Sequence, residues 1–166
     1  MAIVIEQLTY RYGGASGGGR SRSDSAPSPM DAALNGVTMT IGEGEFLGVI
    51  GHTGSGKSTL MQQLCGLLTP TGGSVLVDGF DTRDKQQRKR ARALVGLVFQ
   101  YPEYQLFEET VEKDVAFGPK NLGLSDEEAR AHAREALELV GLPAERFAGK
   151  SPFDLSGGEK RRAALA

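Results

Sequence analysis

The sequence contains one cysteine and no long apolar run, and each scarcity excludes a class of protein. With Cys65 as its one cysteine, the chain cannot form an internal disulfide, which favours a reducing cytosol. The longest apolar stretch, near residues 93–99, is far shorter than the ~20 residues of a membrane-spanning helix. Lys and Arg number 19 against 21 Asp and Glu, so the basic excess of a nucleic-acid-binding protein is also lacking. Any association with a membrane is therefore expected to go through a partner.

Positive charge gathers in one segment only. Its members are Arg83, Lys85, Arg88, Lys89, Arg90 and Arg92. Asp81 and Asp84 interrupt this cluster and no aromatic residue lies within it, so we interpret it as a solvated helix face.

Five short apolar segments predict β-strands. They span residues 2–8, 34–41, 45–50, 74–78 and 94–99. The third and fifth are nearly continuous apolar runs, which are typical of buried parallel strands. An Asp78-Gly79 turn closes the fourth. Residues 13–30 are rich in Gly, Ser and Pro, a composition that predicts a flexible surface loop.

Helical periodicity begins at Lys57, with Leu60, Leu64 and Leu67 on one face, and places Cys65 among packing residues. A polar helix is expected over residues 84–92. A third helix begins at Ser125, which forms a capping box with Glu128 and precedes the apolar stripe of Ala129, Ala133, Leu137 and Val140. The layout predicts an α/β protein with a β-rich lobe over residues 1–100 and a helical lobe over residues 101–166.

One motif predicts phosphate binding. Between a predicted strand and a predicted helix stand Gly51, His52, Thr53, Gly54, Ser55, Gly56, Lys57 and Ser58, which match G-x-x-x-x-G-K-[ST]. The glycines allow backbone N–H groups to point at phosphate oxygens, and the helix adds the positive end of its dipole. We expect Lys57 to reach the β- and γ-phosphates and Ser58 to offer its hydroxyl to Mg²⁺.

A second anion site is predicted in the helical lobe. In Leu155-Ser156-Gly157-Gly158-Glu159, Ser156 can cap a helix whose first residues expose N–H groups. Between the two motifs, Gln100 follows a predicted strand, where its amide can meet Mg²⁺ or the attacking water.

With these motifs, the chain resembles the ATP-binding-cassette (ABC) ATPases, and more narrowly the ATPase subunits of energy-coupling factor (ECF) transporters. The narrow resemblance rests on GHTGSGKST at residues 51–59, FQYPEYQLF at residues 99–107, ETVEKDVAFGP at residues 109–119 and SPFD before the second motif. It covers the whole chain except residues 13–30, where relatives usually have a shorter loop. It implies an ABC-type P-loop nucleotide-binding domain that is incomplete at its C-terminus.

The resemblance also implies roles for individual residues. Residues 51–59, including Thr59, would bind ATP, and Ser58 and Gln100 would meet Mg²⁺. Tyr12 would stack on adenine, with Tyr10 as the alternative. The signature Ser156, Gly157, Gly158 and Glu159 would bind ATP held by a second subunit. Glu159 stands where the family usually has Gln.

The family's catalytic carboxylates follow the signature helix on an apolar strand that ends in Asp-Glu, and no such strand follows here. The segment Val75-Leu76-Val77-Asp78 imitates that strand, but it precedes Gln100 and is followed by Gly79. We therefore expect no catalytic residue here beyond Gln100 as a sensor, and no ATP turnover by the 166-residue chain alone.

The resemblance implies the ATPase subunit of an importer for a vitamin or a transition-metal ion. Its expected partners are a second ATPase subunit, identical or not, an integral membrane transport subunit and a substrate-binding membrane component. Its expected place is the cytoplasmic face of the membrane, with no nucleic-acid partner. Two alternatives stay open: a soluble ABC ATPase of DNA repair or translation, and an ATP-binding fragment without hydrolysis.

Overall fold

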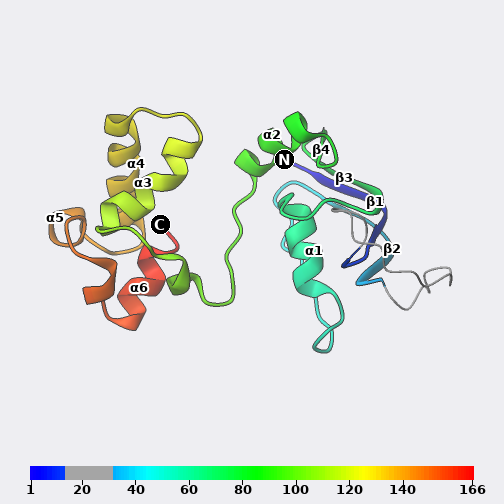
Figure 1. Cartoon of the computed structure of the whole chain (residues 1–166), viewed down its shortest axis with the longest axis horizontal. Coiled ribbons are helices and arrows are strands. Elements are labelled where there is room, and N and C mark those ends of the chain that lie inside the picture. Colours follow the sequence, from blue (N-terminus) through cyan, green and yellow to red (C-terminus); the bar gives the residue numbers. More distant parts are fainter. Residues whose placement is uncertain (14–31) are drawn as a thin grey trace. The chain divides into compact units, whose positions relative to one another are not determined.

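A computed structural model describes residues 1–13 and 32–166, which form two compact units, Met1–Leu97 and Val98–Ala166 (Figure 1). The flexible loop predicted for residues 13–30 lies, apart from Gly13, outside the described residues. The first unit contains β1 (Ile3–Tyr10), β2 (Leu34–Ile41), α1 (Lys57–Leu64), β3 (Gly72–Val77), β4 (Phe80–Asp81) and α2 (Lys85–Leu94).

The strands of the first unit form one antiparallel sheet in the order β2-β1-β3-β4. The predicted strand over residues 34–41 is confirmed with both its bounds. The predicted Asp-Gly turn between β3 and β4 is confirmed as well. Asp78 and Gly79 have φ angles of 49° and 82°, the positive values that a two-residue type I′ hairpin turn requires.

A bulge in β1 keeps its apolar side chains on one face. Ile3 and Ile5 are buried at the expected spacing of two, but the next buried residue is Leu8. The pairing register shifts between Ile5 and Leu8, and Gln7 has a φ of 47°. The extra residue of the bulge returns Leu8 to the buried face. The core of the unit joins the sheet to α1 and α2 through Ile3, Ile5, Leu8, Leu34, Leu60, Leu64, Val75, Val77 and Ala91.

Two strand predictions were wrong. Residues 45–50 and 95–99 form no strand, and Leu94 ends α2 instead of beginning a strand. Their apolar side chains lie in the open: Phe46 is 100% exposed, Ile50 96% and Val98 63%. A parallel strand requires a hydrogen-bonded neighbour, and no strand among the described residues pairs with either segment. The apolar runs therefore remain extended and unpaired.

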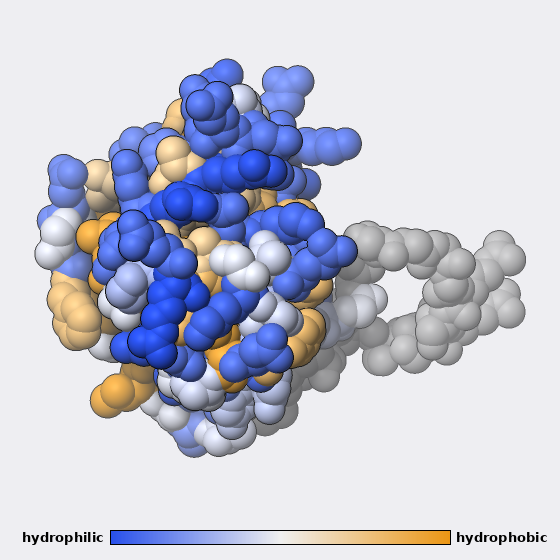
Figure 2. All heavy atoms as spheres, turned by 90° about the vertical axis from the view of Figure 1, so that its left-hand side faces the viewer, coloured by the Kyte–Doolittle hydropathy of each residue, from blue (hydrophilic) through white to orange (hydrophobic). Residues whose placement is uncertain are grey.

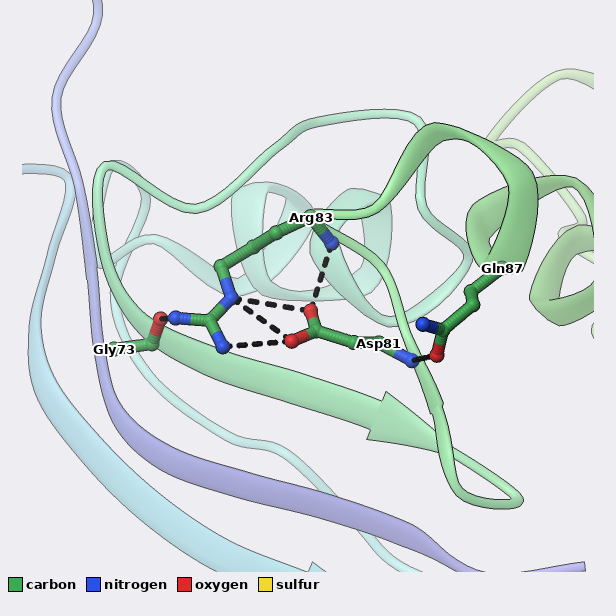
Figure 3. A network of polar contacts seen from close by, with 4 residues as sticks. All are labelled: Gly73, Asp81, Arg83 and Gln87. Carbon is green, nitrogen blue, oxygen red and sulfur yellow. Dashed lines mark hydrogen bonds and ion pairs between the residues drawn. The ribbon is translucent and has the colours of Figure 1, made fainter.

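A polar clasp holds the chain where it leaves the sheet for α2 (Figure 3). The Arg83 guanidinium donates to both carboxylate oxygens of Asp81, with a shortest distance of 2.6 Å, and its Nη1 donates to the Gly73 carbonyl oxygen at 3.0 Å. The Asp81 backbone N–H donates to Oε1 of Gln87 at 3.0 Å. The bond from Arg83 holds the pKa of Asp81 below its ordinary value. The clasp therefore joins the start of β3, the end of β4 and α2.

The basic helix α2 also holds the loop that follows α1. Arg92 donates to the Gly66 carbonyl oxygen at 2.7 and 3.1 Å, and Arg88 donates to the Thr69 hydroxyl. Lys89 and Arg90 are exposed, as expected of a solvated face. The basic cluster thus has a structural part as well as a solvated one. The burial predicted for Cys65, in the loop that α2 holds, is confirmed at 5% exposure.

The second unit is helical. It contains the 3₁₀ helix η2 (Pro102–Gln105), the helices α3 (Val111–Asn121), α4 (Asp126–Leu139) and α5 (Ala144–Phe147), the 3₁₀ helix η3 (Pro152–Asp154) and α6 (Gly157–Ala163). The predicted capping box at Ser125 and Glu128 is confirmed. Three members of the predicted α4 stripe, Ala129, Ala133 and Leu137, are fully buried, whereas Val140, the C-cap of the helix, is only partly buried.

Polar side chains cover most of the visible face of the second unit, with apolar groups exposed between them (Figure 2). Leu139 is 88% exposed and Leu122 62%. Among the described residues, no helix has the length and apolarity that crossing a membrane requires.

The first prediction concerns Gly73, which lies against the β1 bulge with a φ of 73°. A Cβ at this position would lie 2.2 Å from the Gln7 carbonyl oxygen and 2.3 Å from that of Glu6. Gly79 provides a matched control, because its φ is 82° but its added Cβ meets nothing within 4 Å. Gly79→Ala should cost about 1–2 kcal/mol for the left-handed conformation alone. Gly73→Ala should lose a further ~1–3 kcal/mol from overpacking. Urea unfolding followed by circular dichroism measures both; equal losses would contradict the assigned contact.

Candidate functional site

The predicted phosphate loop leads directly into α1 and ends on a glycine in a left-handed conformation. Gly56 is the N-cap of α1, with φ 89° and ψ 1°, and its carbonyl oxygen accepts from the Leu60 N–H at 2.8 Å. Gly54 has a φ of 82°. Side chains with a Cβ are strained at such angles, so the loop needs glycine at both positions to reach the helix.

Close contacts fix two glycines of the loop. A Cβ on Gly56 would lie 2.4 Å from the Ala33 carbonyl oxygen, and one on Gly51 would lie 2.6 Å from Oγ of Ser55. Ala33 in turn donates its N–H to the Tyr10 carbonyl oxygen at 2.8 Å. The end of the loop is thus packed against the residue that precedes β2, which is itself bonded to the end of β1.

The side chain of Lys57 folds back over the loop. Its ammonium group donates to the carbonyl oxygens of Gly51 and His52, each at 2.8 Å, and to Oγ of Ser55 at 3.2 Å. An ammonium group has three donors, and these three acceptors account for all of them. The cation is therefore held over the concave side of the loop, where an anion can exchange for one of its neutral partners.

The first turn of α1 leaves its N–H groups free of side-chain caps. Gly56 provides no capping bond, and the turn contains no acidic residue. The longer helices and α6 differ, because their first N–H groups donate to the side-chain oxygens of the N-cap residues Asp84, Thr110, Ser125 and Ser156. Ser58 is exposed in the same turn. The first turn of α1 thus combines uncapped N–H donors with a nearby ammonium group and contains no carboxylate. This combination favours the binding of a phosphate chain.

The structure separates the two tyrosines that the sequence left as alternatives for the adenine contact. Tyr10 is the last residue of β1 and packs against the core, whereas Tyr12 lies beyond the strand and is 62% exposed. The Tyr12 hydroxyl forms a 3.0 Å hydrogen bond with the Thr59 hydroxyl on α1. The two rings meet edge to face, with centroids 4.9 Å apart. Tyr12 is therefore the residue that presents an open ring face beside the loop.

The remaining predicted site residues belong to the second unit. Gln100 is exposed and stands shortly before η2. Ser156 caps α6, and Gly157 and Gly158 are its first residues and are exposed. The Mg²⁺ contact of Gln100 and the nucleotide contact of the signature remain predictions.

Glu159 completes a capping box with Ser156. Its Oε2 accepts from the Ser156 N–H at 2.8 Å and from the Ser156 hydroxyl at 2.7 Å, while the Ser156 Oγ accepts from the Glu159 N–H at 3.4 Å. These bonds hold the pKa of Glu159 below its ordinary value of 4.5. A carboxylate at this position thus stabilises the start of its own helix.

Sequence reasoning found the loop but missed what supports it. The contact between Gly56 and Ala33 and the bond between Tyr12 and Thr59 join segments that are far apart in the chain. Neither contact follows a recognisable spacing. The one available signal was a hydroxyl-bearing residue, Thr59, directly after the loop motif.

The chain matches the family model described as "ABC transporter" over residues 34–166. It is 53% identical over 168 residues to the energy-coupling factor transporter ATP-binding protein EcfA2 of Clostridium acetobutylicum. It is 60% identical over 167 residues to the protein of the same name in Caldanaerobacter subterraneus subsp. tengcongensis. Each alignment covers 100% of this chain and 54% of the relative, so the chain spans about half the length of these relatives.

Two solved structures share the fold. CbiO1 of Clostridium perfringens, described as part of the ABC transporter complex cbiONQ, is 33% identical with a TM-score of 0.72, over 98% of this chain and 59% of that one. The ATP-binding cassette MJ0796, described as a dimer in a post-hydrolysis state bound to ADP and Pi, is 30% identical with a TM-score of 0.75. That match covers 98% of this chain and 67% of the other.

The second prediction concerns the titration of Glu159. Because the folded-state pKa is lowered, the carboxylate's contribution to stability is present above pH 4.5 and is lost as the pH falls through the folded pKa. Ser156→Ala removes the hydroxyl bond and should raise the pKa of Glu159 toward 4.5. Glu128, which forms the same box with Ser125, is the internal control and should stay low. Carbon-13 NMR titration measures both carboxyls; an unchanged Glu159 would contradict the assigned bond.

Proposed function

Because this chain belongs to the ABC transporter family, we propose that it is the ATP-binding subunit of an ECF-type importer and couples ATP binding and hydrolysis to uptake of a micronutrient. The family model covers most of the chain, and the ABC-type P-loop fold expected from the sequence is confirmed over the part that the chain spans. The cargo class, a vitamin or a transition-metal ion, is the one that the ECF resemblance implies.

The observation that supports ATP binding best is the state of the loop before α1. Lys57 is held over it by three oxygen acceptors, and the first turn of α1 has no side-chain cap. A triphosphate supplies the charge that both features complement. Residues 51–59 would hold the phosphates, and the exposed ring of Tyr12 would stack on the adenine.

Ser58 would offer its hydroxyl to Mg²⁺, and the family resemblance implies the amide of Gln100 as a further ligand. A hydroxyl and an amide oxygen are hard donors of the kind that Mg²⁺ accepts, and the nucleotide phosphates and water supply the remaining ligands. When bound, the ion neutralises charge that develops on the phosphoryl oxygens. Gln100 would in addition position the attacking water.

Asp78 does not serve as the general base. It lies in the hairpin turn between β3 and β4 with a φ of 49°, and its backbone N–H donates to the Ala2 carbonyl oxygen at 2.8 Å. The structure therefore supports the interpretation of the segment that ends at Asp78 as an imitation of a catalytic strand. We assign no other described carboxylate to this role.

Ser156–Glu159 would act on ATP that is bound by a second ATPase subunit. The signature stands at the start of α6, and its glycines are exposed. ATP held between two subunits would draw them together, so that binding and hydrolysis alternately close and open the pair. The second subunit would be a copy of this chain or a different ATPase subunit.

A membrane partner would dock on the aromatic segment that follows Gln100. Tyr101 is 56% exposed, Tyr104 84% and Phe107 58%, and exposed aromatic side chains of this kind are typical interface anchors. Asp114 holds the segment in place, since its carboxylate accepts from the N–H groups of Phe107 and Glu108 at 3.2 and 3.0 Å. This arrangement supports a location at the cytoplasmic face of the membrane, with an integral transport subunit and a substrate-binding component as partners.

The third prediction tests nucleotide binding. Lys57→Ala removes a charge-assisted phosphate contact, which is worth roughly 1.5–3 kcal/mol, so the Kd for Mg-ATP should rise by about 10- to 150-fold. Lys89→Ala removes an exposed lysine of α2 and is the control, with an unchanged Kd expected. Isothermal titration calorimetry provides the Kd, and light scattering on the same samples reports the subunits that associate. Equal affinities in the two variants would rule out the assigned loop.

The fourth prediction tests the membrane partner. Tyr104→Glu places a charge on the aromatic segment and should reduce co-purification with an integral membrane protein at least about tenfold, the effect of losing one interface anchor. Leu139→Glu changes a residue of α4 that is 88% exposed, so it controls for an added surface charge. Mg-ATP affinity should stay unchanged in both variants. Equal recovery of the membrane protein with both variants would contradict the docking site.

A further inference from the structure

We propose that Thr59 is a positioning residue for the base half of the nucleotide site, because its hydroxyl holds the Tyr12 ring in the orientation that receives adenine. The proposal rests on the proposed ATP-binding function. It gives Thr59, a member of the phosphate-binding segment 51–59, a second role toward the base.

The two side chains have contrasting environments. Thr59 is 7% exposed on the inner face of α1, so its hydroxyl has a fixed position. Tyr12 is 62% exposed and lies beyond the end of β1, where the sheet no longer constrains its side chain. The 3.0 Å bond between the two hydroxyls therefore fixes the mobile partner to the immobile one.

A second contact, with Tyr10, also restricts the orientation of the Tyr12 ring. Tyr10 meets Tyr12 edge to face, with an interplanar angle of 89°. Tyr10 packs against the core of the first unit, and its carbonyl oxygen accepts from the Ala33 N–H at 2.8 Å. Its hydroxyl is held by Thr59 and its ring is in contact with Tyr10, while 62% of Tyr12 stays exposed to a ligand.

The bond also joins the two halves of the site. Thr59 directly follows Lys57 and Ser58 in the first turn of α1, which supports the phosphate half. Tyr12 lies 47 residues earlier in the chain and supports the base half. A ring that is ordered before the ligand arrives loses less side-chain entropy on stacking, and this raises affinity for the base without any new contact to it.

The test compares ligands with and without a base. Tyr12→Phe keeps the aromatic ring and removes the hydroxyl, and its exposed position makes a folding defect unexpected. We expect the Kd for Mg-ATP to rise about 2- to 12-fold, the range of one net hydrogen bond, while the Kd for magnesium tripolyphosphate stays unchanged. Thr59→Val removes the hydroxyl of Thr59 and Thr59→Ser keeps it, so Thr59→Ser should bind Mg-ATP more tightly than Thr59→Val.

A double-mutant cycle separates the bond from any direct phosphate contact of Thr59. In the Thr59→Val background, Tyr12→Phe should have no further effect on Mg-ATP binding, because the bond is already absent. Thr82→Val is the control for the same substitution at a buried threonine of the first unit, whose hydroxyl has no hydrogen-bond partner among the described residues. It should leave both ligands unaffected.

The outcomes distinguish this inference from the proposed function. If the wild-type protein binds neither Mg-ATP nor tripolyphosphate, the proposed function is wrong. If it binds both, and Tyr12→Phe either has no effect or weakens both ligands equally, the positioning role is wrong and the proposed function stands. Additive effects of Tyr12→Phe and Thr59→Val would likewise overturn the positioning role.

Discussion

The close approach between Gly56 and the Ala33 carbonyl oxygen is the constraint on which the geometry of the predicted phosphate loop depends. It brings the start of α1 against the residue that precedes β2, at a distance that excludes any side chain on the helix N-cap. Ala33 is in turn hydrogen-bonded to Tyr10, so the end of β1, the start of β2 and the start of α1 meet at one point. The phosphate loop and the exposed tyrosine are positioned from this junction.

Electrostatics distinguish α1 from four of the other helices. The helices α2, α3, α4 and α6 satisfy their first N–H groups with their own side chains, two of them through Ser-Glu capping boxes. A cap stabilises the helix but occupies the donors that an anion would use. In α1 the cap is a glycine and the neighbouring cation is Lys57, so the dipole and the charge remain available to a ligand. The helix α1 therefore lacks the stability that a side-chain cap would add, and its first N–H groups remain available to an anion.

Local patterns predicted those parts of the fold that depend on local interactions. The capping box at Ser125, the Asp78-Gly79 turn and the strand over residues 34–41 are each encoded by neighbouring residues, and all three are present. Residues 45–50 and 94–99 failed for the opposite reason. Their apolar composition indicates that these side chains are more stable when buried. A strand, however, forms only where another strand pairs with it, and composition does not identify that partner.

The same distinction applies to the site. Residues 51–58 were found because the backbone requirements of a phosphate loop are written in consecutive residues. The choice between Tyr10 and Tyr12 was not open to sequence reasoning, because both would lie on the same side of an extended strand. The structure shows how their surroundings differ, since β1 ends at Tyr10, whereas Tyr12 lies beyond the strand and meets Thr59. The adenine contact of Tyr12 stays a proposal. Contacts of this kind, between segments far apart in the chain, leave no periodic pattern in the sequence and cannot be predicted from one.

The bond between Tyr10 and Ala33 has a consequence for how the family can vary. It fixes both ends of the segment between β1 and β2, so the number of residues between them has no direct effect on the positions of Tyr12 or Gly56. The entropy of closing a loop rises only slowly with its length, by ~0.6 kcal/mol for each doubling. Evolution can therefore lengthen or shorten this segment freely while the nucleotide site beside it stays in register.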